Sequence, residues 1–205
     1  MKNLVRVVLM GFMAVLLNGC AEFDVRSGYQ VAPTSGKGVL AVGLSANDEM
    51  PNFYWRLRKI GTTETKDITL WTIHNPPMWE NPKGRLAIVE LDQGDYELFD
   101  WQVVLGFAPT QYFRIPFSVR AGRVTYLGRL HLNLDRAQMR FDVNTTQNKF
   151  TDDYAVLREK IPNISSGLID QTEAVFQTCA DANCKKPLSE TVKRTIVIPI
   201  VIKSR

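Results

Sequence analysis

Leu91-Asp92-Gln93-Gly94-Asp95-Tyr96-Glu97-Leu98 is the stretch that decides the fold class of this chain. It places leucine, glycine and tyrosine at the spacing of a tyrosine corner, in which the tyrosine hydroxyl bonds back to the backbone as the chain enters a strand. A tyrosine that follows a glycine turn without such a bond is the alternative. Because tyrosine corners are typical of β-sandwiches, the stretch favours that fold.

The sequence on both sides of this turn has the pattern of short β-strands. Alternating or short apolar runs predict strands over residues 39–44, 53–58, 68–73, 85–91, 95–105, 112–119 and 123–134. In the last of these, alternation predicts an apolar face of Val124, Tyr126, Leu130, Leu132 and Leu134 and a polar face of Arg123, Thr125, Arg129 and His131. We expect a mainly β chain whose antiparallel sandwich, of immunoglobulin or transthyretin-like type, spans residues 37–145.

Residues 146–205 are expected to pack on the sandwich with one or two short helices and a C-terminal strand. Tyr154, Leu157 and Ile161 share one helical face, which predicts a helix over residues 152–160 that ends before Pro162. Residues 168–178 fit either a second helix or an extended arm. Residues 195–202 are β-branched and apolar, and Pro199 assigns that strand to an edge or a bulge.

Cys20 predicts where the protein is located. Lys2 and Arg6 precede a mostly apolar run over residues 7–17, and the run ends in Leu17-Asn18-Gly19-Cys20. Residues 1–19 therefore resemble a bacterial lipoprotein signal peptide that ends in a lipobox. An ordinary signal peptide that leaves Cys20 free is the alternative. The resemblance implies cleavage before Cys20 and attachment of two or three acyl chains to it, which is enough for stable membrane anchoring.

The residues after Cys20 predict to which membrane the protein is sorted and how far from that membrane its folded domain lies. Ala21, rather than an aspartate, follows the cysteine; by analogy with sorting in Gram-negative bacteria, this favours the periplasmic face of the outer membrane if the host is Gram-negative. Residues 20–36 contain Gly28, Pro33 and Gly36 and lack long apolar runs. We expect them to form a flexible lipidated tether that spans roughly 50 Å when stretched.

A family resemblance covers roughly residues 38–165. The hairpin pattern F-x-V-x-x-G-x-V-x-Y-L-G over residues 117–128, the G-x-Y of Gly94 to Tyr96, and D-x-x-x-L-x-x-K-x-P over residues 153–162 resemble uncharacterised proteobacterial lipoproteins close to the DUF2846 domains. The L-x-x-G-x-Y spacing of Leu91 to Tyr96 is also similar to transthyretin-like and carboxypeptidase-regulatory-like domains. The shared residues are turn glycines and core aromatics, so the resemblance implies a sandwich and supplies no catalytic residue.

Cys179 and Cys184 remain after Cys20, and an oxidising exported compartment predicts that they form a disulfide. Redox pairs usually have two intervening residues and zinc needs four ligands, whereas no histidine is close in sequence to these cysteines. A metal site is therefore not expected here.

Three other groups of residues are candidate sites. Trp79, in the proline-containing loop over residues 76–80, is the tryptophan most open to a glycan; a tryptophan folded back over the core is the alternative. His131 and His74 have no visible catalytic partner and are expected at the surface. Arg56, Arg58 and Lys59 form a basic strand face, which either meets anionic headgroups or is simply solvated.

These observations predict a lipid-anchored, non-catalytic envelope module that binds a partner protein. Loss of Lys2 and Arg6 with the signal lowers the formal net charge from +4 to +2, so nucleic acid is not an expected partner. Neither a hydrolase signature nor a nucleotide-binding fingerprint occurs, so no cofactor is implied. The alternatives are a peptidoglycan or glycan binder that uses Trp79 and, less favoured, a hydrolase with an unrecognised site.

Overall fold

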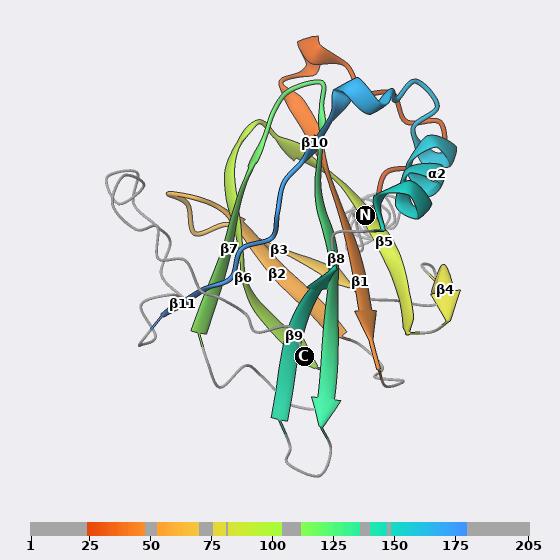
Figure 1. Ribbon diagram of the computed structural model, residues 1–205. Coiled ribbons are helices and arrows are strands. Elements are labelled where there is room, and N and C mark those ends of the chain that lie inside the picture. Colours follow the sequence, from red (N-terminus) through yellow and green to blue (C-terminus); the bar gives the residue numbers. More distant parts are fainter. Residues whose placement is uncertain are drawn as a thin grey trace, which may run out of the picture.

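The computed structural model describes residues 24–47, 53–69, 76–80, 82–103, 112–135, 140–146 and 149–179. These residues form two sheets with an apolar core between them (Figure 1), which confirms the predicted mainly β sandwich. The first sheet has the order β10-β8-β1-β5-β4, and β9 pairs with β8; the second has the order β11-β7-β6-β2-β3.

The first sheet is built around β1 (Lys37–Ala46), which lies between two long strands. β1 pairs antiparallel with β5 (Lys83–Asp92) and parallel with β8 (Val124–Asp135). The short strand β10 (Ile169–Gln171) also pairs parallel with β8. β4 (Trp79–Glu80) and β9 (Arg140–Thr146) complete the sheet, and neither was predicted from the sequence.

The second sheet contains β2 (Phe53–Lys59), β3 (Thr65–Thr69), β6 (Gly94–Val103), β7 (Tyr112–Val119) and β11 (Gln177–Cys179). Its described strands pair antiparallel. At the start of β6, the Tyr96 hydroxyl donates a hydrogen bond of 2.8 Å to the carbonyl oxygen of Asp92. The predicted tyrosine corner is therefore confirmed, and burial raises the pKa of Tyr96 to about 12.

A bulge in β8 makes the predicted division of that strand into two faces wrong. Ala41 pairs with Tyr126 but Gly43 pairs with Arg129, so three steps along β8 oppose two along β1. Gly128 absorbs the extra residue with φ at 78°, a conformation that favours glycine. As a result, Tyr126 lies in the outer cluster whereas Leu130 lies in the core between the sheets, and the outward side chains Tyr126 and Arg129 share one face.

The apolar residues form two layers. The first lies between the two sheets and includes Leu40, Trp55, Leu98, Trp101 and Ile115. The second lies on the outer face of the first sheet, where Val39, Ile88 and Val124 pack against helix residues Leu157 and Ile161. α2 (Phe150–Lys160) therefore covers this face of the sheet (Figure 1), and the predicted helix is confirmed.

The structure corrects the tether expected over residues 20–36, because the chain is folded from Asp24 onward. Val25 and Val31 are buried in the outer apolar layer. The Val25 amide donates to the Ile88 carbonyl oxygen at 2.7 Å, and the side-chain amide of Asn163 donates to the Val31 carbonyl oxygen at 3.2 Å. Residues 24–36 are thus a packed layer of the domain.

The sequence left a second helix or an extended arm open for residues 168–178. The structure shows an extended segment over residues 169–179, which we call the arm. A short 3₁₀ turn (Ser166–Leu168) leads into β10 on the first sheet, and the chain then crosses to β11 on the second sheet. Figure 1 shows this crossing in blue, from β8 to β7. The predicted C-terminal strand over residues 195–202 lies outside the described residues. No helix among the described residues is long and apolar enough to cross a membrane.

Candidate functional site

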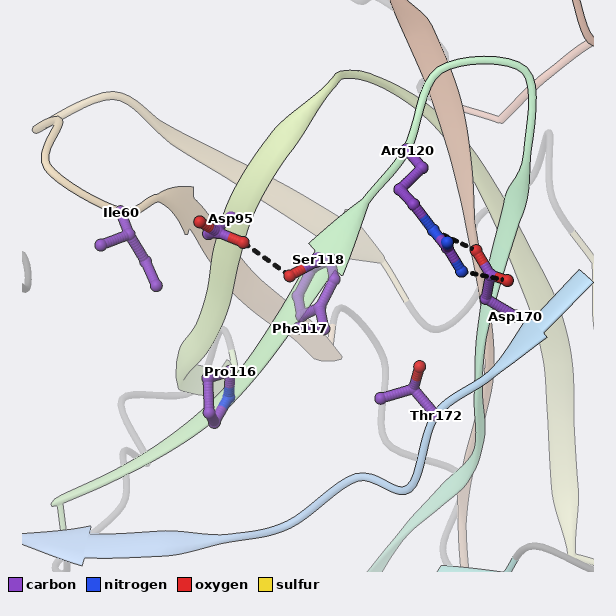
Figure 2. Close-up of a pocket in the computed structure, with 8 residues that line it drawn as sticks. All are labelled: Ile60, Asp95, Pro116, Phe117, Ser118, Arg120, Asp170 and Thr172. Carbon is purple, nitrogen blue, oxygen red and sulfur yellow. Dashed lines mark hydrogen bonds and ion pairs between the residues drawn. The ribbon is translucent and has the colours of Figure 1, made fainter. Parts of the chain in front are cut away.

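A pocket of about 520 Å³ lies where the arm passes the second sheet. Its lining residues come from the position after β2, from β6, from β7 and the position just past its end, and from the arm. They are Ile60, Asp95, Pro116, Phe117, Ser118, Arg120, Asp170 and Thr172 (Figure 2). We call it the arm pocket. Pro116 and Ser118 alternate with the core residues Ile115, Phe117 and Val119, so the pocket opens on the outer face of the second sheet.

Two polar pairs shape the arm pocket. The Ser118 hydroxyl donates to Asp95 Oδ1 at 2.5 Å. Arg120 donates through Nε to Asp170 Oδ2 at 2.9 Å, and Figure 2 shows this ion pair on the opposite side of the pocket from Ile60. Ser118 and Arg120 are exposed, so both hydroxyl and guanidinium groups are accessible to a partner. The lining therefore combines donors, acceptors and apolar surface in an open depression.

Asp170 attaches the arm to the turn between β7 and β8. Arg123 donates to both carboxylate oxygens, at 2.7 Å from Nη2 to Oδ1 and 2.9 Å from Nε to Oδ2, and Arg120 Nη2 lies 2.5 Å from Oδ1. Hydrogen bonds from Arg123 and then Arg120 outweigh burial and lower the pKa of Asp170. The ionised carboxylate thus fixes the start of the arm beside the pocket.

The outer face of the second sheet also contains a buried ion pair. Arg58 Nε donates to Glu97 Oε1 at 2.6 Å, and the two side chains are 3% and 0% exposed. The Arg58 guanidinium lies 3.9 Å from the Phe99 ring centroid, and Arg114 lies 3.5 Å from the second oxygen of Glu97. Arg56 instead pairs with Asp67 at 2.9 Å. The basic strand face predicted at Arg56 and Arg58 is therefore neutralised by carboxylates, and Arg58 is not solvated.

Trp79 does not lie in an exposed loop, because it forms β4 and packs on the outer apolar layer. The Arg129 guanidinium lies 4.0 Å from the Trp79 ring centroid. The indole Nε1 is buried and has no hydrogen-bond partner in the described part of the chain. Arg129 thus occupies one ring face of Trp79, which leaves less of the ring open to a glycan, and the site role of Trp79 stays a prediction.

The same arginine belongs to a buried network that joins α2 to β8. Arg129 Nη2 donates to Asp153 Oδ1 at 2.6 Å, and the Tyr126 hydroxyl donates to Asp153 Oδ2 at 2.6 Å. Gly43 makes this possible, since a Cβ there would lie 2.3 Å from Arg129 Cγ. Burial, and then the hydrogen bond to Asp153, raise the pKa of Tyr126 above its usual range. The network is structural, because Asp153 is fully buried and already paired.

His131 is half-buried rather than a free surface side chain. It contacts Ser45, its paired residue on the neighbouring strand β1. Its Nδ1 lies 3.0 Å from Ser45 Oγ, and burial lowers its pKa. Ser45 is 3% exposed. A serine that is closed to substrate is poorly placed to act as a nucleophile.

The other predicted site residues fall largely outside the described residues. Cys20, Cys184 and His74 are all in this group. Cys179 ends β11 and is half-buried, and the disulfide between Cys179 and Cys184 stays a prediction. Within the described part of the chain, no group of three or more His, Cys, Asp or Glu side chains could hold a metal ion.

Sequence reasoning missed the arm pocket. Its lining comes from four segments that are distant in sequence, and no local pattern brings Asp170 to Arg120 and Arg123. Comparison with protein-family models gave no match, and comparison with curated proteins found no similar chain.

Proposed function

We propose that this chain is a membrane-anchored envelope lipoprotein, held by lipid on Cys20, whose sandwich is a non-catalytic binding module for a partner protein. In a Gram-negative host, the anchor would place it on the periplasmic face of the outer membrane. The family resemblance to proteobacterial lipoproteins is part of this proposal.

The observation that carries the proposal is the arm pocket. It is an open depression of about 520 Å³ whose exposed Ser118 and Arg120 offer hydrogen bonds and charge beside the apolar surface of Ile60 and Pro116. Such mixed linings suit a side chain or loop of another protein, whose interfaces have an apolar centre and a polar rim. The glycan-binding alternative is less favoured, because Arg129 covers a ring face of Trp79.

Site-specific photo-crosslinking in cells tests this function. A photoreactive amino acid at Thr172 should crosslink one envelope protein, identified by mass spectrometry, because Thr172 lines the arm pocket. The same group at Ala155, which is exposed on α2, is the matched control and should not capture that protein. Ser118→Trp fills the pocket and should abolish the crosslink from Thr172. Equal capture from both positions, or a crosslink that survives Ser118→Trp, would contradict the assignment of the pocket as the binding site.

A further inference from the structure

The first described residue, Asp24, is held firmly at one side of the sandwich. Its carboxylate forms an ion pair with Arg85, whose side chain is 2% exposed, and its Oδ1 accepts a hydrogen bond of 3.2 Å from the Ile88 amide. Arg85 Nε also donates to the carbonyl oxygen of Thr69 at 3.2 Å. Asp24 is therefore fixed where β5 of the first sheet meets β3 of the second.

This attachment leaves little chain between the fold and Cys20. Only residues 21–23 separate Cys20 from Asp24, and a fully extended chain covers at most about 3.6 Å per residue. The Cα atoms of Cys20 and Asp24 therefore lie within about 14 Å of each other. A lipid on Cys20 would bring Asp24 close to the headgroups, whose layer is itself roughly 5–7 Å thick on each side of the bilayer.

We propose that the folded domain lies directly against the bilayer surface, with its Asp24 side on anionic phospholipid headgroups and the arm pocket facing away. This inference rests on the proposed lipid anchor at Cys20. The strand orders place β5 and β3 toward one side of the sandwich and the arm with β7 toward the other. The protein is then an oriented platform that presents its pocket to the compartment.

The surface beside Asp24 carries basic side chains, which anionic phospholipid headgroups attract. Residues 26–28 run along the end of α2, where the Gly28 amide donates to the Lys160 carbonyl oxygen at 3.1 Å and the Ser27 hydroxyl to that of Glu159 at 3.4 Å. Arg26 is exposed there, and Arg158 and Lys160 form the basic last turn of the helix. Basic side chains near a membrane are attracted to anionic lipid. Glu159 partly offsets this attraction.

Fluorescence quenching on vesicles tests the orientation. The lipidated protein carries a fluorescent unnatural amino acid at Arg26 or, as the matched control, at Ser118, and is reconstituted into phosphatidylcholine–phosphatidylglycerol vesicles that contain headgroup spin-labelled lipid. We expect several-fold stronger quenching at position 26 than at position 118. A long Gly-Ser segment inserted between Phe23 and Asp24 should remove most of this difference, because the domain can then leave the surface.

The outcomes separate the orientation from the anchor. Equal quenching at positions 26 and 118 in protein that sediments with the vesicles, or a difference unchanged by the insertion, would overturn the orientation while leaving the anchor intact. Failure of the wild-type lipoprotein to sediment, or sedimentation of Cys20→Ser to the same extent, would overturn the anchor and the orientation with it.

Discussion

At the residue scale, buried and half-buried polar side chains with well-defined hydrogen-bond partners stabilise this fold. The Tyr96 hydroxyl closes the tyrosine corner onto Asp92, and Asp153 receives donors from Tyr126 and Arg129. Because such groups are buried, removal of one partner costs the desolvation of the other.

Tyr96→Phe tests the corner. The substitution removes only the hydroxyl and leaves the Asp92 carbonyl without that donor, so we expect a loss of about 1 kcal/mol in the free energy of unfolding. Urea titration followed by fluorescence measures it. Tyr154→Phe is the control, because the Tyr154 hydroxyl makes no hydrogen bond within the described part of the chain. Equal losses in both variants would mean that the corner bond does not stabilise the fold.

Arg129→Met tests the buried network. Asp153 is fully buried, so loss of its guanidinium partner should destabilise the domain by about 3 kcal/mol or more. Adding Asp153→Asn removes the unpaired charge and should restore part of that loss, as measured by the same urea titration. A double variant no more stable than Arg129→Met would show that charge burial is not the cause.

At the scale of elements, the sequence predicts those strands and helices whose apolar residues follow a regular local pattern. The predicted strand over residues 112–119 coincides with β7, and the helix predicted over residues 152–160 begins only two residues earlier, at Phe150. Alternation could not reveal the bulge at Gly128, since one inserted residue reverses the faces of β8 beyond it.

Segments whose order depends on distant contacts were not predictable. Residues 24–36 have the composition of a tether, yet Val25 and Val31 are buried among residues such as Leu157 and Ile164, far along the chain. The arm likewise takes its extended form by pairing with β8 and β7 rather than from its own pattern. The arm pocket was not predictable for the same reason, because the arm forms one of its walls.

The attachment of the arm should depend on pH. The folded state lowers the pKa of Asp170 through Arg123 and Arg120, so the carboxylate stabilises the arm above the ordinary carboxyl pKa near 4. That stabilisation is lost as the pH falls through the lowered value. Hydrogen exchange of residues 169–174, corrected for the intrinsic pH dependence, should therefore become less protected in acid.

Asp170→Asn should reproduce this loosening at neutral pH. Amides of residues 169–174 should exchange faster than in the wild type, whereas Asp152→Asn on the exposed face of α2 should leave them unchanged. Identical protection of the arm in wild type and Asp170→Asn would show that the arginine contacts do not hold it.

At the scale of the whole molecule, the packed N-terminal segment and the arm pocket lie on different parts of the surface. α2 and residues 24–36 cover the outer face of the first sheet, and the arm pocket opens on the outer face of the second. With lipid on Cys20, the side that holds Asp24, where β5 meets β3, would be the attachment side, and the arm pocket on the other side would be free to meet a partner. Removal of residues 1–19, as proposed, would leave a near-neutral chain, which agrees with a specific protein partner more than with a polyanion.

Membrane fractionation of wild type and Cys20→Ser, with metabolic labelling by an alkyne fatty acid, tests the central claim most directly. We predict that the wild type carries the label and sediments with membranes, whereas Cys20→Ser is unlabelled, soluble and still folded by circular dichroism. A Cys20→Ser protein that stays in the membrane fraction, or a wild type without the fatty acid, would contradict the lipid-anchored module.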